Sequence, residues 1–495
     1  MAVDPRRPLV CGVAQATWHE GAPDPIAMCA QVARAAAEDS GAGSAVIDGV
    51  GAVGVVDIAS RRWADPGALV ATELGIEPEL TLRTELGGDG PVRLVAELCR
   101  RIQDGELDCA LVCGAEALAT AAKAMADGSE PEGWPALDEG ARPGVVVGDD
   151  RIPHTDAEFA ANMIAPVIVY PLFEYGLWRE QGGTIEEHRG RLGRLWERFA
   201  SVARTNPLSW APDAPGPQEI ATPSAANRLV TLPYTKLLNS NITTDQAAAL
   251  VLCSQEFADR AGIAAERRVY PLAFGLASDR WFVTSRERLD RSPAAGIASR
   301  GALAGAGTGI DDVAFLDIYS CFPSAVQMSC AELGIDPWTD SRDPTVTGGL
   351  TFFGGPGNNY VTHSLASMAQ RLREHPGETG LCTAVGWYMT KHGAAVLRSG
   401  EPDGPLALFD GAKEVARLPE RAMAAGREGP ASAEAASIVY DREGGPTVAT
   451  VTAIFEDGAR GVGKSADPDF MAELARAPIT GETVRLGADG TVEPG

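Results

Sequence analysis

Apolar positions along the first third of the chain alternate between a helical spacing and short continuous runs. Residues 27–39 form an alanine-rich helical pattern, residues 52–59 an apolar run, and residues 69–74 a short helical turn. A further helix begins at Pro91, and the continuous apolar run 109–113 follows it. Continuous short runs are typical of strands buried on both faces. The pattern therefore predicts an α/β protein with a parallel sheet that helices cover on both sides.

The same order of glycine loop, helix and buried strand occurs twice. In the first copy the loop 87–90 opens the helix, and Gly-Glu at 105–106 leads to the strand. In the second copy the loop 354–357 opens a helix, and Gly-Glu at 377–378 leads to the apolar run 381–385. Internal repetition of this kind indicates a duplicated unit. We interpret the chain as two α/β halves that can stack on each other.

Composition divides the chain further. Residues 126–228 carry Pro- and Gly-rich segments around helical patterns, so we expect an inserted loop domain there. It would separate the first half at 1–125 from a return to that half at 229–265, and the second half would follow at 266–405. Residues 406–495 would form an additional small domain.

The last segment is predicted to be a small β domain. Residues 447–455 alternate, Asp457-Gly458 is typical of a hairpin turn, and 483–486 and 491–492 add short strands. We expect a small barrel of the oligonucleotide/oligosaccharide-binding type that folds independently. Residues 458–465 match the phosphate-binding-loop expression, but the hairpin before them and the short chain after them exclude the parallel sheet that such a loop needs. We therefore expect no ATP binding.

The densest glycine cluster lies within residues 346–367, directly before a helical pattern. Gly354, Gly355 and Gly357 can admit a ligand against bare main chain, and Asn358 can cap the helix. A helix N-terminus presents free N–H groups that suit an anion or a developing oxyanion. The alternative is a tight strand-to-helix turn in which the glycines meet steric needs only.

Several reactive side chains accompany the predicted strands. Tyr319 and Cys321 follow the short apolar run 315–318, and ligands of open α/β sheets bind at the carboxyl ends of strands. Cys382 lies in the last buried strand or at its exit. His363 could supply an imidazole, although a lone histidine near a helix end is more often a structural hydrogen-bonding group.

Charge narrows the range of partners. The chain has 42 Lys and Arg against 67 Asp and Glu, and the net charge of −25 argues against nucleic acid or an anionic membrane as the main partner. Within this acidic chain, residues 188–204 form a basic island that includes Arg194 and Arg198. The island is either a solvated helix face or a phosphate-binding face for an anionic ligand.

Other features of the composition exclude further classes. No apolar run approaches the roughly 18 residues of a membrane span, and the residues after Arg7 indicate a strand, so we expect a cytoplasmic protein. The nine cysteines are odd in number and lack paired C-x-x-C motifs. Neither a disulfide framework nor a zinc site is therefore indicated.

Five segments, in this order along the chain, resemble the thiolase superfamily: residues 105–116, 241–249, 319–322, 348–356 and Cys382. The resemblance covers roughly residues 5 to 400 and points to the thiolase-like proteins related to sterol-carrier-protein thiolases, often labelled acetyl-CoA acetyltransferases, that carry an extra C-terminal domain. It implies a layered αβαβα core of two duplicated halves. It also implies coenzyme A as substrate or ligand, no tightly bound cofactor, and a possible homodimer.

The sequence departs from this family at its catalytic loops. Gly88 corresponds to the family's nucleophilic cysteine, and Gly355 corresponds to the histidine of the Gly-His-Pro loop. Tyr319 stands at the Asn or His of the second loop, whereas Cys382 matches the acid/base cysteine and Cys321 matches a cysteine of the sterol-carrier-linked thiolases. A thiolase nucleophile is a thiolate stabilised by an imidazole. With both absent, acyl transfer through residue 88 is chemically impossible.

Two functions remain open. One is an acyl-CoA enzyme of lipid metabolism without a covalent intermediate, either acyltransferase-like or a retro-aldol or retro-Claisen C–C lyase that uses Tyr319 or a cysteine as base. The other is a degenerate thiolase that binds CoA esters without catalysis. In both cases the ligand would be CoA or acyl-CoA, held by Gly88, Gly354, Gly355, Gly357, Asn358, Arg194 and Arg198 around Tyr319, Cys321, Cys382 and His363.

Overall fold

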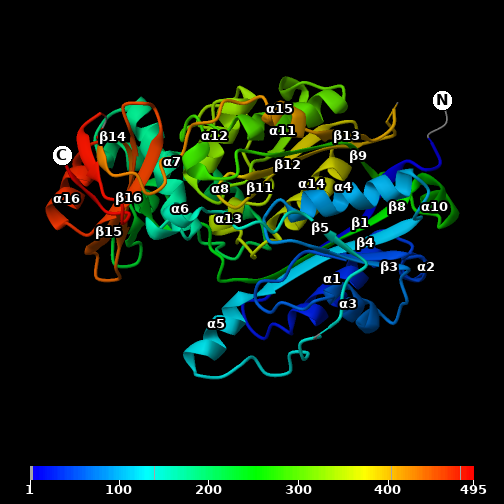
Figure 1. The fold of residues 1–495 in the computed structure, drawn as a ribbon. Coiled ribbons are helices and arrows are strands. Elements are labelled where there is room, and N and C mark those ends of the chain that lie inside the picture. The colour runs from blue at the N-terminus through cyan, green and yellow to red at the C-terminus, as the bar shows by residue number, and fades with distance from the viewer. Residues whose placement is uncertain (1–3, 139, 403, 480) are drawn as a thin grey trace.

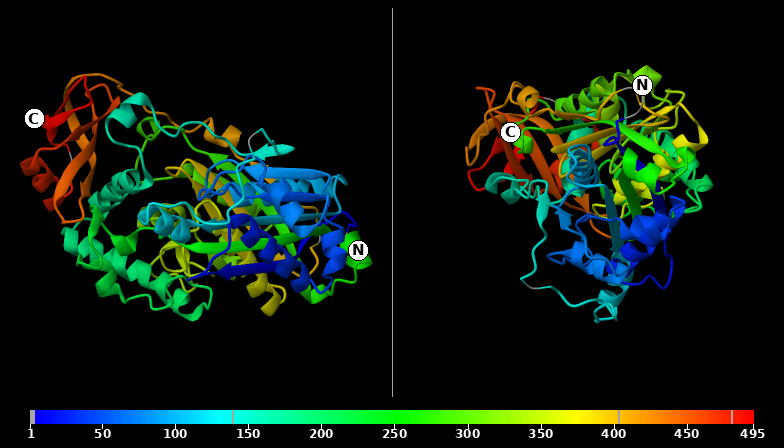
Figure 2. Two further views of the ribbon diagram at one scale, coloured as in Figure 1. Left: turned by 90° about the horizontal axis from the view of Figure 1, so that it is seen from below. Right: turned by 90° about the vertical axis from the view of Figure 1, so that its right-hand side faces the viewer.

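Eleven strands join one large sheet in the computed structural model, which describes residues 4–138, 140–402, 404–479 and 481–495 (Figures 1 and 2). The first half contributes, in spatial order, β5 (Val145–Val147), β3 (Leu80–Thr84), β2 (Ala52–Val55), β4 (Cys109–Ala117), β8 (Asp245–Ser254) and β1 (Pro8–Thr17). The second half contributes β9 (Val269–Ser278), β12 (Lys391–Ser399), β11 (Thr379–Gly386) and β10 (Phe315–Asp317), with β13 (Ala407–Asp410) beside β9. The halves meet where Val10 pairs with Val269.

The sheet is mixed, which corrects the expectation of a parallel sheet. Strand β4 runs parallel to β2 but antiparallel to β8 on its other side. Every residue of β4 is nevertheless buried. The apolar run 109–113 therefore reports burial on both faces and says nothing about the direction of the neighbouring strands.

Two helices form the central layer of the molecule. Helix α4 (Gly90–Gln103) and helix α14 (Tyr360–Glu374) each contact strands of both halves (Figure 1). Pro91 lies in the first turn of α4, where its missing N–H leaves no hydrogen bond unmade. Each of these helices leads into the strand that the repeat predicted, α4 into β4 and α14 into β11. The duplicated α/β unit is confirmed.

The two halves of the sheet, joined where β1 meets β9, form the two β layers on either side of α4 and α14, and the outer helices cover their other faces. Helix α1 (Pro25–Asp39) covers β1, β8 and β4, with α2 (Ser44–Asp48) and α3 (Pro66–Leu74) beside it. In the second half, α11 (Pro293–Gly305) covers β9 and β12, and α12 (Pro323–Leu333) packs on α11. The layers therefore follow the order αβαβα, as the thiolase resemblance implied.

Each half has one strand glycine at the same place, directly beneath its outer helix. A Cβ built on Gly12 of β1 would stand 2.0 Å from the carbonyl oxygen of Ala36 in α1, and one built on Gly275 of β9 would stand 2.0 Å from that of Ala298 in α11. Both helices lie so close to the sheet that only glycine fits beneath them. Alanine-rich helices are suited to this approach because their side chains are short.

The segment between β4 and β8 is largely helical. It contains α5 (Leu118–Ala126), α6 (Asp156–Ala160), α7 (Pro166–Gln181), α8 (Ile185–Thr205) and α9 (Pro217–Ala221), followed by the short strands β6 (Leu229–Thr231) and β7 (Tyr234–Thr235). Helix α8 starts with a capping box between Thr184 and Glu187. Two further helices lie outside this segment, α10 (Gln255–Arg260) after β8 and α13 (Gly349–Phe352) within the glycine-rich stretch.

The C-terminal residues form a second, antiparallel sheet. Its order is β16 (Arg460–Ser465), β15 (Pro446–Ile454), β14 (Gly429–Tyr440), β17 (Thr483–Leu486) and β18 (Val492–Pro494), with α15 (Ala412–Val415) before it and α16 (Pro468–Arg476) after β16. A bridge from Lys464 to Thr491 brings the first strand back to the last, so the sheet curls like a small barrel. Most of the phosphate-binding-loop letters, residues 460–465, lie in extended β16, which pairs antiparallel with β15, so the predicted hairpin context of that motif is confirmed.

The barrel shares its sheet with the rest of the chain, although we expected it to fold independently. Strand β6 pairs with β14 through Thr231 and Val439. The amide of Ile479 donates to the hydroxyl of Tyr175 in α7 at 2.7 Å, and the hydroxyl of Thr450 donates to the carbonyl of Ala161 at 2.8 Å. Figure 1 shows α6 and α7 between the barrel and the large sheet.

Candidate functional site between the two halves

The two glycine loops of the repeat meet at the N-termini of the central helices. The side-chain oxygen of Asn358 accepts the N–H of Gly87 at 3.0 Å, and its side-chain nitrogen donates to the carbonyl of Asp57 at 3.1 Å. Asn358 thus ties the loops together, whereas the residue at the N-cap of α14 is Asn359, whose side chain makes no capping bond.

The glycines of the second loop are required by close approach. Gly354 and Gly357 have φ angles of +120° and +51°. A Cβ on Gly354 would stand 2.2 Å from a side-chain oxygen of Gln246, and one on Gly357 would stand 2.3 Å from a carboxylate oxygen of Glu116. Gly355 has a negative φ and donates its N–H to the carbonyl of Asn241 at 2.8 Å. The loop is therefore packed against the ends of β4 and β8.

Tyr319 occupies the space where a side chain at position 88 would begin. A Cβ built on Gly88 would stand 2.2 Å from the Tyr319 hydroxyl and 2.6 Å from the carbonyl oxygen of Val385. The backbone N–H of Tyr319 donates to the hydroxyl of Thr383 at 2.9 Å, which fixes the start of this loop. Burial raises the pKa of the Tyr319 phenol well above its ordinary value, so the phenol is protonated. A hydrogen-bond donor thus stands in place of a nucleophile.

Cys321 lies beside this phenol. Its thiol is 8% exposed, and burial raises its pKa to about 12. The hydroxyl of Tyr170, which contacts the thiol, donates to the carbonyl of Trp387 at 2.9 Å and accepts the N–H of Met389 at 3.2 Å. Trp387 and Met389 both have positive φ, at 56° and 54°. Cys321 is therefore a neutral, buried thiol beside a constrained stretch of backbone.

Cys382 lies deeper, within β11. It is fully buried, and burial, followed by the neighbouring carboxylate of Asp317, raises the pKa of its thiol. Asp317 pairs with it across the parallel strands β10 and β11. This carboxylate accepts hydrogen bonds from the hydroxyl of Thr345 at 2.9 Å, the N–H of Val346 at 3.0 Å and the hydroxyl of Tyr360 at 3.1 Å. Asp317 was missed from the sequence because it sits within an apolar run.

His363 points from α14 into the interior of the protein. The ring nitrogen Nδ1 lies 3.0 Å from the side-chain oxygen of Gln15, and the ring packs edge-on against Phe353 with centroids 5.2 Å apart. Complete burial lowers its pKa to about 3, so the imidazole is neutral. Its contacts match the structural role that a lone histidine most often has.

The basic island is not assembled with the glycine loops. The guanidinium of Arg198 donates to the carbonyls of Pro337 at 2.6 Å and Asp340 at 2.7 Å, and also to the carbonyl of Arg342. Arg198 therefore holds the loop before the glycine-rich stretch. Arg194, on the same helix α8, is exposed to solvent.

A buried charged cluster lies next to Gly88 and was missed from the sequence. The ammonium of Lys391, 1% exposed, donates to the carbonyls of Leu86 at 2.5 Å and Asp149 at 3.2 Å. It lies 3.5 Å from the carboxylate of Asp89, which also pairs with Arg93. The signal available in the sequence was a lysine shortly before the apolar run 393–397, at the first position of β12.

The site offers hydrogen-bond donors and neutral thiols. Tyr319, Cys321 and Cys382 are buried with raised pKa values, so none supplies an anion near pH 7. Within the described ranges, no group of three or more His, Cys, Asp or Glu side chains could hold a metal ion. No helix of the described chain is long and apolar enough to cross a membrane.

This arrangement of two repeated halves, central helices and facing glycine loops is the thiolase fold. No protein-family model matches the sequence, and no curated protein sequence matches it. Solved structures do. The monomeric SCP2-thiolase-like protein type 1 of Mycobacterium smegmatis matches over 100% of both chains, with 26% identity and a TM-score of 0.85.

Two other structures match the thiolase-like part of the chain. Human mitochondrial 3-ketoacyl-CoA thiolase matches over 80% of this chain and 100% of its own, with 14% identity and a TM-score of 0.57. An Ltp2-ChsH2(DUF35) aldolase matches over 80% of this chain and 98% of its own, with 16% identity and a TM-score of 0.57. The chain therefore has the thiolase fold, and over its full length it is similar to an SCP2-thiolase-like protein.

Proposed function

We propose that the chain binds CoA esters between its two halves without forming an acyl-enzyme. The thioester would lie at Tyr319, beside the facing glycine loops. CoA is in this proposal a ligand that exchanges with solvent, not a resident cofactor. Arg194, exposed on α8, is the cation of the basic island that remains available to its phosphates.

The observation that carries this proposal is the position of the Tyr319 hydroxyl. It fills the place in which a nucleophile at residue 88 would begin, 2.2 Å from an ideal Cβ. The protonated phenol can donate a hydrogen bond to a carbonyl but cannot attack it. A thioester carbonyl needs such a donor whether it is bound or converted. The neutral thiols of Cys321 and Cys382 add no competing nucleophile.

Calorimetry with two ligands tests the proposal. Acetyl-CoA carries a thioester carbonyl, and CoA lacks it. Tyr319→Phe removes the donor, so it should weaken acetyl-CoA binding by about three- to tenfold, the value of one hydrogen bond, and leave CoA binding unchanged. Tyr440→Phe, in the C-terminal sheet, serves as the matched control. Equal weakening for both ligands, or no binding of either to the wild-type protein at millimolar concentration, contradicts the proposal.

A second candidate is a C–C lyase that acts on CoA esters. The protonated state of Tyr319 favours it, because a phenol that donates to the thioester oxygen would stabilise the enolate that a retro-aldol cleavage produces. The fold likeness to an aldolase is in keeping with this chemistry. Incubation with a 3-hydroxyacyl-CoA, followed by analysis of the products, separates the candidates: a released aldehyde or ketone supports the lyase, and intact substrate supports binding alone.

A further inference from the structure

The C-terminal barrel has an incomplete seam along the free edge of β16. At Arg460 the N–H donates to the carbonyl of Ala422 and the carbonyl accepts the N–H of Ala424, both at 2.8 Å. Further along, the N–H of Lys464 donates to the carbonyl of Gly490 at 2.8 Å. The segment around Met423, opposite Arg460, and the segment around Thr491, opposite Lys464, both run parallel to β16. The two segments are therefore pieces of one interrupted strand.

Val462 lies opposite the interruption. Backbone groups of alternate residues point to the same edge of a strand, so the N–H and C=O of Val462 face the seam, as those of Arg460 do. Neither group has a backbone hydrogen-bond partner in the described turns 424–427 and 487–490 that flank the seam. In a parallel ladder, one partner residue would supply both, through the carbonyl before it and the N–H after it. The missing piece is one residue long.

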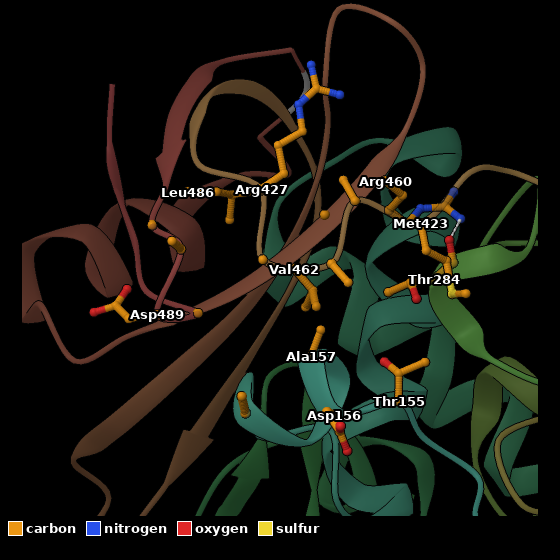
Figure 3. Close-up of a pocket in the computed structure, with 18 residues that line it drawn as sticks. Thr155, Asp156, Ala157, Thr284, Met423, Arg427, Arg460, Val462, Leu486 and Asp489 are labelled. Atoms are coloured by element: carbon orange, nitrogen blue, oxygen red, sulfur yellow. Dashed lines mark hydrogen bonds between the residues drawn. The ribbon is translucent and has the colours of Figure 1, made fainter.

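A cavity of about 330 Å³ occupies this interruption (Figure 3). Figure 3 shows the side chain of Val462 pointing toward Ala157 of α6, while Met423 and Leu486 lie on other sides of the space. The remaining lining includes backbone of the glycine-containing turns at 424–427 and 487–490. The cavity thus combines apolar walls with one free donor and one free acceptor of the main chain.

The side chains of β16 do not fill the cavity. A Cβ on Gly461 would stand 2.6 Å from the side chain of Leu486, and one on Gly463 would stand 2.7 Å from the carbonyl of Thr491. Glycines at these positions let β16 lie close against the turns, so no side chain of its own fills the cavity. The two arginines that line the cavity are already paired: Arg460 donates to the carboxylate of Glu434 at 2.6 and 2.7 Å, and Arg427 donates to that of Asp457 at 2.6 Å.

We propose that this cavity binds an extended diamide, whose carbonyl accepts the Val462 N–H and whose following N–H donates to the Val462 carbonyl. Such a ligand restores the interrupted ladder by strand addition. Two sources carry this chemistry: a residue of a peptide with its flanking amides, and the pantetheine arm of CoA, whose amides are one methylene further apart. The site is distinct from the loops around Tyr319.

The test uses the full-length protein labelled with ¹⁵N-valine. N-acetylvaline N-methylamide and pantetheine are titrated separately, and N-acetylvaline methyl ester serves as the probe that lacks the second N–H. The Val462 resonance should shift with at least one diamide, and the tighter of the two identifies the source. The ester should bind about three- to tenfold more weakly than the N-methylamide if the peptide-like source applies, because one hydrogen bond is lost.

Two variants make the outcome specific. Val462→Pro removes the donor, and with it the reporting resonance, so binding to this variant is measured by calorimetry; it should weaken the diamide by a similar factor, and proline is tolerated at an edge whose N–H faces outward. Ala157→Phe should fill the cavity and abolish binding, whereas Ala122→Phe on the exposed helix α5 should not. Failure of both diamides to shift Val462 at millimolar concentration overturns the proposal. Retained binding in Ala157→Phe overturns it equally.

Discussion

Gly88→Cys places a thiol at the position of the thiolase nucleophile and should lower the free energy of unfolding. The new Cβ would stand 2.2 Å from the Tyr319 hydroxyl and 2.6 Å from the carbonyl of Val385, whereas ordinary contacts of a Cβ lie at 3.4–4 Å. The φ angle of Gly88 is not positive, so the strain comes from packing and not from the backbone. Overpacking of this kind costs about 1–3 kcal/mol.

A double-mutant cycle locates that strain. Tyr319→Ala alone should cost about 3–5 kcal/mol, because it leaves a cavity where a buried aromatic ring was. In that background, Gly88→Cys should cost less than in the wild-type protein, because the clash with the phenol is gone and only the one with the Val385 carbonyl, at 2.6 Å, remains. The coupling energy between the two positions should therefore exceed about 0.5 kcal/mol.

Urea unfolding monitored by tryptophan fluorescence measures the four free energies of unfolding. Tyr440→Ala, in the C-terminal sheet, replaces Tyr319→Ala in a matched cycle, which should be additive within about 0.5 kcal/mol. Additivity of the Gly88 and Tyr319 variants would refute the reasoning that the phenol occupies the nucleophile's position. Gly88→Cys should also remain unacylated by acetyl-CoA, because its thiol would be buried without a neighbouring imidazole.

Three further outcomes are expected. Burial lowers the folded-state pKa of His363 to about 3 and that of His392, in β12, to about 4, below the unfolded value near 6.5. The free energy of unfolding should therefore be highest above pH 6.5 and should fall by about 2 kcal/mol for each histidine between pH 6.5 and 5, as measured by urea unfolding at each pH. His363→Gln should reduce this dependence of the unfolding free energy on pH, whereas the exposed His375→Gln should not. Cys321, with a pKa of about 12, should resist iodoacetamide at pH 7.5 in the folded protein and react after denaturation; rapid labelling would show an activated thiol. Arg460→Met should cost about 1–3 kcal/mol in urea unfolding, because it leaves the part-buried carboxylate of Glu434 in β14 without its charged hydrogen-bond partner, and a loss below about 0.5 kcal/mol would contradict the role of that ion pair.

The repeat was predictable because it is local in sequence. The glycine loop, amphipathic helix and buried strand each have a pattern within about twenty residues, and both copies fold as expected, as α4 with β4 and α14 with β11. Strand direction was not predictable, since β4 is apolar whether its neighbour is β2 or β8. Pairing between strands far apart in the chain leaves no mark on the pattern of a buried strand.

The candidate site was predictable in part for the same reason. Tyr319, Cys321 and the glycine loops were indicated by local motifs, and the structure brings Tyr319 against Gly88 from the other half. That contact joins residues far apart in sequence, so no local pattern announces it. Asp317 and Lys391 were missed because each lies at one end of an apolar strand, and its buried partners come from distant parts of the chain.

Mass spectrometry of the wild-type protein with acetyl-CoA distinguishes noncovalent binding from acyl transfer. Under native conditions we expect a complex of protein and acetyl-CoA that CoA competes away. After denaturation the same sample should return to the mass of the unmodified chain, because Tyr319 donates a hydrogen bond and no thiolate attacks. An acetyl group that survives denaturation on Cys321 or Cys382, formed within seconds, would contradict noncovalent binding and establish a nucleophile at a new position.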